Sequence, residues 1–155
     1  MAKLSAGLLL YRISDGGIDV LIAHPGGPFW ARKDDGAWSI PKGEYDLDED
    51  PWAAAQREFV EELGLPPPAG PRIDLGEVRQ PGGKIVTAYA VHADLDVSAA
   101  QSNTFELEWP KGSGRIRTLP EVDRVAWVPV ATARVKLLKG QLPLLERLLT
   151  AVDQD

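Results

Sequence analysis

Residues 43–65 read GEYDLDEDPWAAAQREFVEELGL, and most of the fold and function predictions start from this stretch. Asp50 followed by Pro51 is typical of a helix N-cap and first turn, and Gly64 is typical of a helix stop. The residues between them, 52–63, are mostly good helix formers. We therefore expect one helix here, preceded by a loop that begins at Gly43.

The predicted helix has an apolar side and an acidic side. At about 100° per residue the apolar side chains gather on one side: Trp52, Phe59 and Leu63, with Ala53 and Val60 beside them. Three glutamates fall within an arc of roughly 100° on the other side: Glu58, Glu61 and Glu62. Like charges at this spacing repel each other by about 0.2–0.5 kcal/mol per pair. A divalent cation removes that repulsion, and Mg²⁺ prefers carboxylate oxygens, so the cluster predicts a metal site.

The spacing of the charged and glycine residues resembles the Nudix box. That pattern is G, five residues, E, seven residues, then R-E-apolar-x-E-E-x-G-apolar, and this chain matches it at every position from Gly43 to Leu65. The resemblance implies a hydrolase that uses divalent cations to cleave a diphosphate linkage in compounds built on a nucleoside diphosphate. It also implies an α/β fold, the α/β/α sandwich with a mixed β-sheet, as a single Nudix domain over residues 1–155.

Similarity to the family assigns the metal ligands. Glu58, Glu61 and Glu62 become the central ligands, and the carbonyl of Gly43 becomes a further one because glycine permits close backbone approach. The expected cofactor is Mg²⁺, with Mn²⁺ as a substitute. The alternative is a solvated acidic helix face, which charge runs commonly form. Helix periodicity alone favours that alternative, and the correctly spaced Gly43, Glu49 and Arg57 favour the metal site.

The catalytic residues implied by the resemblance are Glu58, Arg57, Glu61 and Glu121. Arg57 is expected to orient a box glutamate through charge-assisted hydrogen bonds. The general base is left open between a box glutamate and a later carboxylate; Glu121 is a candidate because it lies just before the last predicted strand, where some members of the family place such a glutamate. Glu121 is equally compatible with a plain loop acid. Further candidates for the base share one face of a predicted strand: Glu106 and Glu108.

Substrate recognition is expected from basic residues outside the box. Lys42 precedes Gly43 directly, and Arg32 and Lys33 follow the aromatic pair at 29–30. Lys84 is a further candidate; an ammonium group can bind phosphate as a point charge. The Pro-Lys-Gly sequence at 41–43 resembles Nudix members that act on dinucleoside polyphosphates or diphosphoinositol phosphates.

Diadenosine polyphosphates are therefore the first substrate hypothesis, and ADP-ribose or a nucleotide sugar is the second. Two hypotheses from other functional classes stay open. One is a non-catalytic Nudix-fold module that binds a nucleotide, although such modules usually lose a box residue. The other is an acidic interaction domain without any site.

Composition limits the partners. The chain has 155 residues, 44% of them hydrophobic, a formal charge of −6 and no cysteine. Eight acids lie between positions 44 and 62 against one base, which argues against a nucleic-acid-binding surface and leaves a small nucleotide as the expected partner. The apolar start is too short to span a membrane, so we expect a cytoplasmic protein without membrane contact. The resemblance allows a homodimer.

The remaining patterns predict strands around the central helix and helices at the end of the chain. Turn signals at 14–17 and 81–83 each connect the two strands of a predicted hairpin. The predicted strands are Ser5–Arg12, Asp19–His24, Trp38–Ile40, Asp74–Gln80, Lys84–Ala93, Thr104–Trp109 and Arg124–Pro129. From Ala131 to about Val152 we expect a short and a longer helix separated by Gly140. The apolar stripe of the longer helix is predicted at Leu142, Leu145, Leu148 and Leu149.

Overall fold

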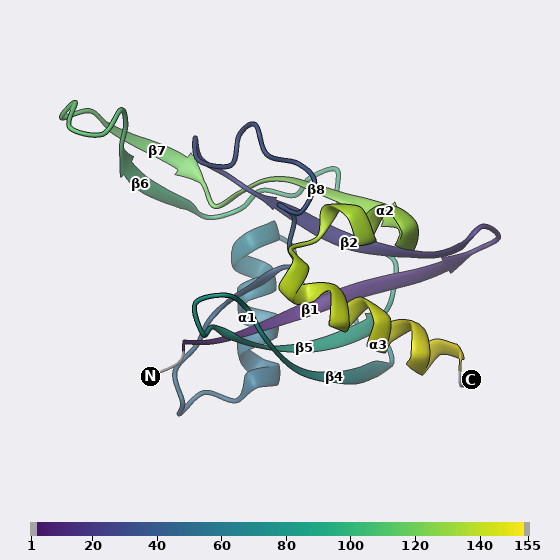
Figure 1. Cartoon of the computed structure of the whole chain (residues 1–155). Coiled ribbons are helices and arrows are strands. Elements are labelled where there is room, and N and C mark those ends of the chain that lie inside the picture. Colours follow the sequence, from purple (N-terminus) through teal and green to yellow (C-terminus); the bar gives the residue numbers. More distant parts are fainter. Residues whose placement is uncertain (1–2, 154–155) are drawn as a thin grey trace.

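A computed structural model describes residues 3–153, which form a mixed sheet with helices on both faces (Figure 1). The elements in chain order are β1 (Leu4–Ser14), β2 (Gly17–Pro25), β3 (Lys42–Glu44), α1 (Pro51–Leu63), β4 (Arg72–Arg79), β5 (Ile85–His92), β6 (Thr104–Glu108), β7 (Ile116–Pro120), β8 (Val122–Pro129), α2 (Val130–Lys136), the short 3₁₀ turn η1 (Lys139–Gln141) and α3 (Leu142–Asp153).

Strand β1 is the centre of the sheet, whose order is β4-β5-β1-β2-β8. One edge of β1 pairs in parallel with the whole length of β5, from Leu4↔Ile85 to Tyr11↔His92. The other edge is shared: β2 pairs with Tyr11 to Ser14, and the short β3 pairs with Ser5 to Gly7. Since β1 and β2 separate in this way, the backbone just before Gly43 fits between them. The mixed sheet confirms the predicted fold class.

Alternation along β1 produces the two layers of the sandwich. Ala6, Leu8 and Leu10 point to α1, where they pack with Phe59 and Leu63. On the opposite face, Leu9 and Tyr11 belong to the core formed with α2 and α3. This alternation of a fully buried strand explains why the first strand reads as a nearly continuous apolar run.

The limits of α1 are as predicted. The side chain of Asp50 accepts a hydrogen bond from the Ala53 amide, Pro51 occupies the first turn, and Gly64 ends the helix in the left-handed region at φ 68°. A left-handed C-terminal residue favours glycine because it has no Cβ.

The predicted division of α1 into an apolar and an acidic side is wrong in part. Val60 is 44% exposed and Ala53 is exposed, whereas Ala54 and Ala55 are fully buried. The buried arc therefore includes Glu58, which is only 8% exposed. Small alanines on this arc let the helix lie close to β1, so a glutamate on the same arc is buried with them.

The segment at 38–40 differs from the predicted strand. Only isolated bridges form there, Ser39 with Ala23 and Trp38 with Leu137. The backbone groups of this segment bond separately to β2 and to the 136–138 segment, because Pro41 ends regular pairing. Strands β3 and β7 were not predicted. They are short, three and five residues, and lack a clear period-2 apolar pattern.

Strands β6 and β7 form a separate two-stranded arm that projects from the body (Figure 1). Phe105 of β6 and Leu119 of β7 are paired across the two strands, so their side chains lie on the same side of the arm. That side is contacted by the 26–30 loop, where Phe29 meets Trp109 edge-to-face at 5.3 Å. The arm joins the body at residue 103 before β6 and at residue 121 after β7, close to the end of α1.

The last helices confirm the predicted pattern with one shift. In α3 the fully buried leucines are Leu144, Leu145 and Leu148, while Leu142 and Leu149 are half-buried. None of the helices formed by residues 3–153 has the length and hydrophobicity needed to cross a bilayer.

Candidate active site

Gly43 lies against the carboxylate of Glu58. Strand β3 pairs with β1 at Ala6↔Gly43, and this pairing holds residue 43 over the buried face of α1. A Cβ built on Gly43 would lie 1.9 Å from Oε2 and 2.1 Å from Cδ of Glu58. No side chain fits at this separation, so the close approach explains the glycine that begins the motif.

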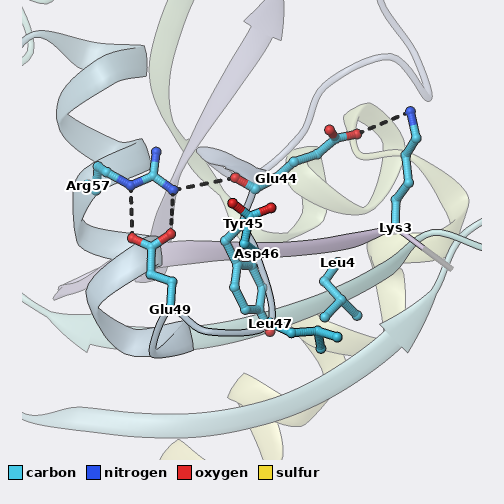
Figure 2. A pocket seen from close by; sticks show the side chains of 8 residues that line it. All are labelled: Lys3, Leu4, Glu44, Tyr45, Asp46, Leu47, Glu49 and Arg57. Atoms are coloured by element: carbon cyan, nitrogen blue, oxygen red, sulfur yellow. Dashed lines mark hydrogen bonds and ion pairs between the residues drawn. The ribbon is translucent and has the colours of Figure 1, made fainter. Parts of the chain in front are cut away.

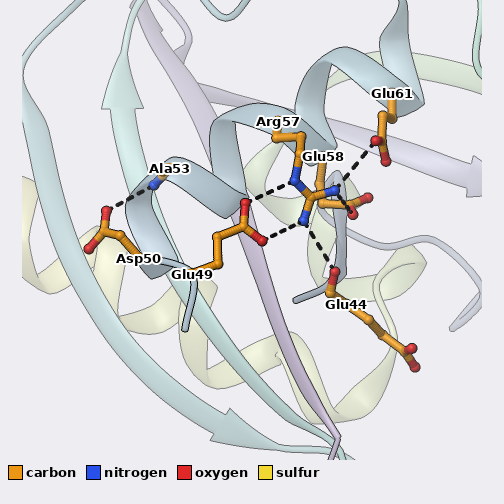
Figure 3. A network of polar contacts seen from close by, with 7 residues as sticks. All are labelled: Glu44, Glu49, Asp50, Ala53, Arg57, Glu58 and Glu61. Atoms are coloured by element: carbon orange, nitrogen blue, oxygen red, sulfur yellow. Dashed lines mark hydrogen bonds and ion pairs between the residues drawn. The ribbon is translucent and has the colours of Figure 1, made fainter. Parts of the chain in front are cut away.

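Arg57 uses all of its N–H groups in one network (Figure 3). Nε and Nη2 form a bidentate ion pair with Glu49, in which each nitrogen lies 2.9 Å from one carboxylate oxygen. Nη1 donates to Glu58 at 2.7 Å and to Glu61 at 3.4 Å, and Nη2 also reaches the carbonyl of Glu44 at 3.4 Å. The guanidinium therefore fixes the loop before α1 relative to two box glutamates.

The charges of this network shift one another's pKa. The hydrogen bond from Arg57 lowers the pKa of Glu49, and the pair raises the pKa of Arg57. Burial raises the pKa of Glu58, although the hydrogen bond from Arg57 works in the opposite direction. Glu58 is thus a desolvated carboxylate that a single cation only partly compensates.

Glu62 is the other desolvated carboxylate. Its Oε1 accepts a hydrogen bond from the Lys42 amide at 3.1 Å, and burial raises its pKa to about 8. The hydrogen bond and the charge of Lys42 lower this pKa, and the charges of Glu58 and Glu121 make smaller contributions that raise it; about 8 is the net result. Burial, followed by the charge of Lys84, lowers the pKa of the Lys42 ammonium. Carboxylates and ammonium groups that act on one another's pKa are therefore held in a partly desolvated region around Glu62 and Lys42.

Glu121 is held beside the end of α1 by a relay of backbone hydrogen bonds. The Asn103 amide donates to the Glu61 carbonyl at 2.7 Å, and the Glu121 amide donates to the Asn103 carbonyl at 2.8 Å. The Glu121 carbonyl accepts from the Gly26 amide at 2.9 Å. Burial raises the pKa of Glu121, and the charge of Glu61 raises it further. The carboxylate after β7 is therefore electrostatically linked to the box.

A cavity of about 390 Å³ brings several of the sequence candidates together. Its lining includes Lys42, Glu62, Lys84 and Glu121. The remaining lining residues are Ala23, Pro25, Trp30, Ala37, Ser39, Gln80, Pro81, Val122 and Leu138.

Two of the predicted substrate-binding residues lie elsewhere. Arg32 and Lys33 are exposed in the 26–37 loop and are not among the residues that line this cavity, and the Lys33 ammonium lies 5.1 Å from the ring of Trp30. Glu106 and Glu108 lie out on the arm, where Glu108 accepts from the Gly112 amide. Gln80 lines the cavity without any local sequence signal, because a lone polar residue in a hairpin turn is ordinary.

A second cavity, of about 780 Å³, lies on the outer side of the loop before α1 (Figure 2). Arg57 and Glu49 form part of its wall, and Leu47 on its rim is 80% exposed. Glu58, Glu61, Glu62 and Glu121 are not among its lining residues. Larger size alone does not make it the reactive cavity, since Glu62 and Glu121, whose pKa values are raised by burial, line the 390 Å³ cavity instead.

The fit of a divalent cation follows from the donors rather than from a preformed cage. Within residues 3–153 no group of three or more acidic or histidine side chains is already arranged to hold a metal ion. Arg57 contacts Glu58 and Glu61 in its place. Carboxylate oxygens and backbone carbonyl oxygens are nevertheless the kind of ligand that Mg²⁺ prefers. Burial raises the pKa of Glu58 and of Glu62, and a nearby divalent cation would favour their ionised forms, so the donor set fits such an ion.

His24 has a structural role outside the box. It is fully buried in β2, with Nδ1 2.7 Å from the Asp123 carboxylate and Nε2 2.6 Å from the Lys33 carbonyl. It thereby ties the 26–37 loop to β8, next to Glu121. His92 stacks on Tyr11 at 4.9 Å.

Comparison with known proteins agrees with this geometry. A family model described as the NUDIX domain matches residues 1–148. Over 54 residues the chain is 41% identical to an RNA pyrophosphohydrolase of Hahella chejuensis, a match that covers 34% of this chain and 34% of that protein. The chain thus matches about a third of the length of this curated relative.

Solved structures share the fold over nearly the whole chain. An Ap4A hydrolase of C. elegans in a binary complex superposes with a TM-score of 0.64 and 20% identity, covering 99% of this chain and 100% of that one. The NUDIX domain of Shewanella oneidensis NrtR, complexed with ADP ribose, has a TM-score of 0.68 and 21% identity and covers 98% and 89%. At these identities the likeness concerns the fold alone. The family match, the mixed sheet and the complete motif together show that the chain belongs to the Nudix family.

Proposed function

We propose that this protein is a divalent-metal-dependent hydrolase that cleaves a diphosphate linkage in a nucleoside diphosphate-linked compound. The observation that carries this proposal is the cavity lined by two carboxylate residues, Glu62 and Glu121, and by two lysines, Lys42 and Lys84. Carboxylates suit the metal and the attacking water, and ammonium groups suit the phosphates. A solvated acidic helix face would have no reason to bury Glu58 and to half-bury Glu62.

The box residues have a metal-holding role in this proposal. Glu58, Glu61 and Glu62 hold Mg²⁺ or Mn²⁺ together with the carbonyl of Gly43. A bound divalent ion would supply Lewis-acid activation and neutralise charge on the phosphoryl oxygens. Arg57 keeps Glu58 and Glu61 in orientation through the network of Figure 3.

The residues outside the box complete the reaction. Glu121 accepts a proton from the attacking water, and its raised pKa moves it toward the working range of a general base. Lys42 and Lys84 bind phosphoryl oxygens of the substrate. The water oxygen forms a new bond to phosphorus as the bridging P–O bond breaks, so the leaving group departs as a phosphate.

A dinucleoside polyphosphate such as a diadenosine polyphosphate is the substrate we propose. The Pro41-Lys42-Gly43 sequence supports it, as does the fold likeness to an Ap4A hydrolase. ADP-ribose is the second candidate, because a neighbour of similar fold is complexed with it.

A substrate panel tests the proposal. Diadenosine polyphosphates, ADP-ribose, nucleotide sugars, nucleoside triphosphates and a short RNA with a 5′-polyphosphate end are incubated with Mg²⁺ or with EDTA. We expect Mg²⁺-dependent turnover of a dinucleoside polyphosphate, lost by more than about 100-fold in Glu62→Gln and kept in the exposed control Glu77→Gln. Parental rates in Glu62→Gln at limiting Mg²⁺ would contradict the ligand assignment.

Metal-linked stability separates the enzyme from a simple acidic helix. Ions that bind the folded carboxylates but not the unfolded chain raise the melting temperature by mass action. We expect a higher midpoint in millimolar Mn²⁺ than in EDTA, and a smaller difference for Glu62→Gln. Identical midpoints across a Mn²⁺ titration would favour a helix face without a metal.

A further inference from the structure

Gln141 is a fully buried polar residue outside the box, at the end of η1. Its Oε1 accepts from the Ile40 amide at 3.0 Å. Its Nε2 donates to Ser39 Oγ at 2.9 Å and to Gln80 Oε1 at 3.1 Å. The carboxamide of Gln141 thus connects three parts of the chain: the segment before Gly43, the β4–β5 turn and η1, which leads into α3.

The direction of each hydrogen bond in this group follows from one fixed donor. A backbone amide only donates, so the Ile40 amide determines which end of the Gln141 carboxamide is oxygen. The other end must be NH₂, and it can meet only the oxygen of the Gln80 carboxamide. Gln80 is therefore left with its own NH₂ as a donor. Within residues 3–153 this NH₂ has no acceptor of its own.

The backbone of Gln80 is held as firmly as its side chain. Its amide donates to the Lys84 carbonyl at 2.8 Å, and its carbonyl accepts from the Gly83 amide at 3.1 Å. Gly140 packs against it so closely that a Cβ there would lie 3.1 Å from Gln80 Cγ. The position and the polarity of the Gln80 NH₂ are thus both set before any ligand binds, which lowers the cost of binding.

The surroundings of this donor indicate its ligand. Gln80 lines the same 390 Å³ cavity as Lys42 and Lys84, beside the carboxylates Glu62 and Glu121. An NH₂ donor near two ammonium groups suits an anionic oxygen with several lone pairs, which is the chemistry of a phosphoryl group. A nucleobase carbonyl would need only one donor and no cation.

We propose that the Gln80 NH₂, fixed in its donor orientation by the buried Gln141, hydrogen-bonds a phosphoryl oxygen of the substrate in this cavity. The proposal rests on the proposed function in one respect, because it assumes that the phosphate chain occupies the 390 Å³ cavity. Gln141 acts through Gln80 and is a positioning residue. Gln80 helps the protein to bind a phosphate chain in preference to an uncharged ligand.

Binding of ADP, inorganic pyrophosphate and adenosine with Mg²⁺, measured by calorimetry, tests the proposal. Gln80→Leu removes the donor, and we expect ADP and pyrophosphate to bind about 5- to 20-fold more weakly with adenosine unaffected. Gln80→Glu still accepts from Gln141 but repels phosphate, so a larger loss is expected. The control Gln101→Leu changes an exposed glutamine outside the cavity and should leave all three affinities unchanged.

Gln141→Met tests the positioning role. Gln80 is then free to rotate, so ADP binding should weaken in Gln141→Met. The double variant with Gln80→Leu should bind ADP as weakly as Gln80→Leu alone, because Gln141 acts only through Gln80. Additive losses would show that Gln141 acts by another route and would overturn its part of the proposal.

The outcomes for the inference and for the proposed function differ. Unchanged ADP affinity in Gln80→Leu, equal losses for adenosine and ADP, or a parental protein that binds neither ADP nor pyrophosphate would overturn the inference. Selective loss of ADP binding in a protein that hydrolyses no substrate of the panel would support the inference and contradict the proposed hydrolase.

Discussion

The carboxylate of Glu58 occupies the place where a side chain on residue 43 would begin, 1.9 Å from a Cβ built on Gly43. The first residue of the motif and a glutamate fifteen positions later are therefore one steric unit. A methyl group at residue 43 must displace either β3 or the carboxylate that we assign to the metal.

Gly43→Ala is accordingly predicted to be harmful out of proportion to its size. We expect unfolding free energy to fall by about 1–3 kcal/mol from overpacking, and activity to fall by more than about 10-fold because Glu58 is displaced. Thermal melting and turnover measure the two effects. Gly16→Ala is the control, since a Cβ there meets nothing within 4 Å; equal behaviour of the two variants would contradict the steric account.

Arg57→Lys is predicted to lower activity by about 10- to 100-fold with little change in stability. A single ammonium cannot reproduce the bidentate ion pair with Glu49 and at the same time contact Glu58 and Glu61. Arg134→Lys is the matched control, because Arg134 forms an exposed pair with Glu146 far from the box. Parental turnover in Arg57→Lys would remove the orienting role from Arg57.

The helix that carries the box was predictable because its signals are local. Asp50, Pro51 and Gly64 act within one turn of the positions they determine, and all three do what their types predict. The burial of Glu58 and the exposure of Val60 were not predictable, because periodicity gives the angle of a residue on the helix and not how close a neighbouring strand comes.

Residues that meet across the fold left no mark in the sequence. Gln141 and Gln80 are 61 positions apart, and Ile40 and Gln141 are 101 apart, so no spacing rule connects them. Glu121 was placed correctly before the last strand, but its link to Glu61 through the backbone of Asn103 depends on the arm, of which β7 was not predicted.

Metal-free protein is predicted to lose stability as pH rises. Burial raises the pKa of Glu62 from 4.5 to about 8, so between these values the folded state keeps a proton that the unfolded state has lost. The unfolding free energy should therefore fall between about pH 4.5 and about pH 8, by up to about 5 kcal/mol for this group at about 1.4 kcal/mol per pH unit. Denaturant melts in EDTA across this range measure the slope.

Glu62→Gln should have a shallower slope than the parent, and Glu77→Gln should match the parent because Glu77 is exposed. Saturating Mg²⁺ should flatten the parental slope, because the ion stabilises the ionised carboxylates. A parental unfolding free energy that rises with pH in EDTA over this range would contradict the burial of Glu62 in the folded protein.

Glu121→Gln is predicted to lower kcat by about 100-fold while KM changes by less than about threefold. The amide keeps the size of the side chain but cannot accept the proton of the attacking water. Kinetics over a range of substrate concentrations separate the two constants. Unchanged kcat would move the role of the base to a box glutamate, because Glu106 and Glu108 lie on the arm outside the cavity.

In the proposed reaction, water attacks phosphorus inside the polyphosphate, and the glutamates of α1 would hold the metal that this attack requires. The most direct measurement is hydrolysis of diadenosine tetraphosphate with Mg²⁺ in ¹⁸O water, followed by mass spectrometry of the products. The account predicts one solvent oxygen on a phosphate product, formed by the parental protein and not in EDTA or by Glu62→Gln. Label on a sugar hydroxyl, or equal product formation in EDTA, would contradict it.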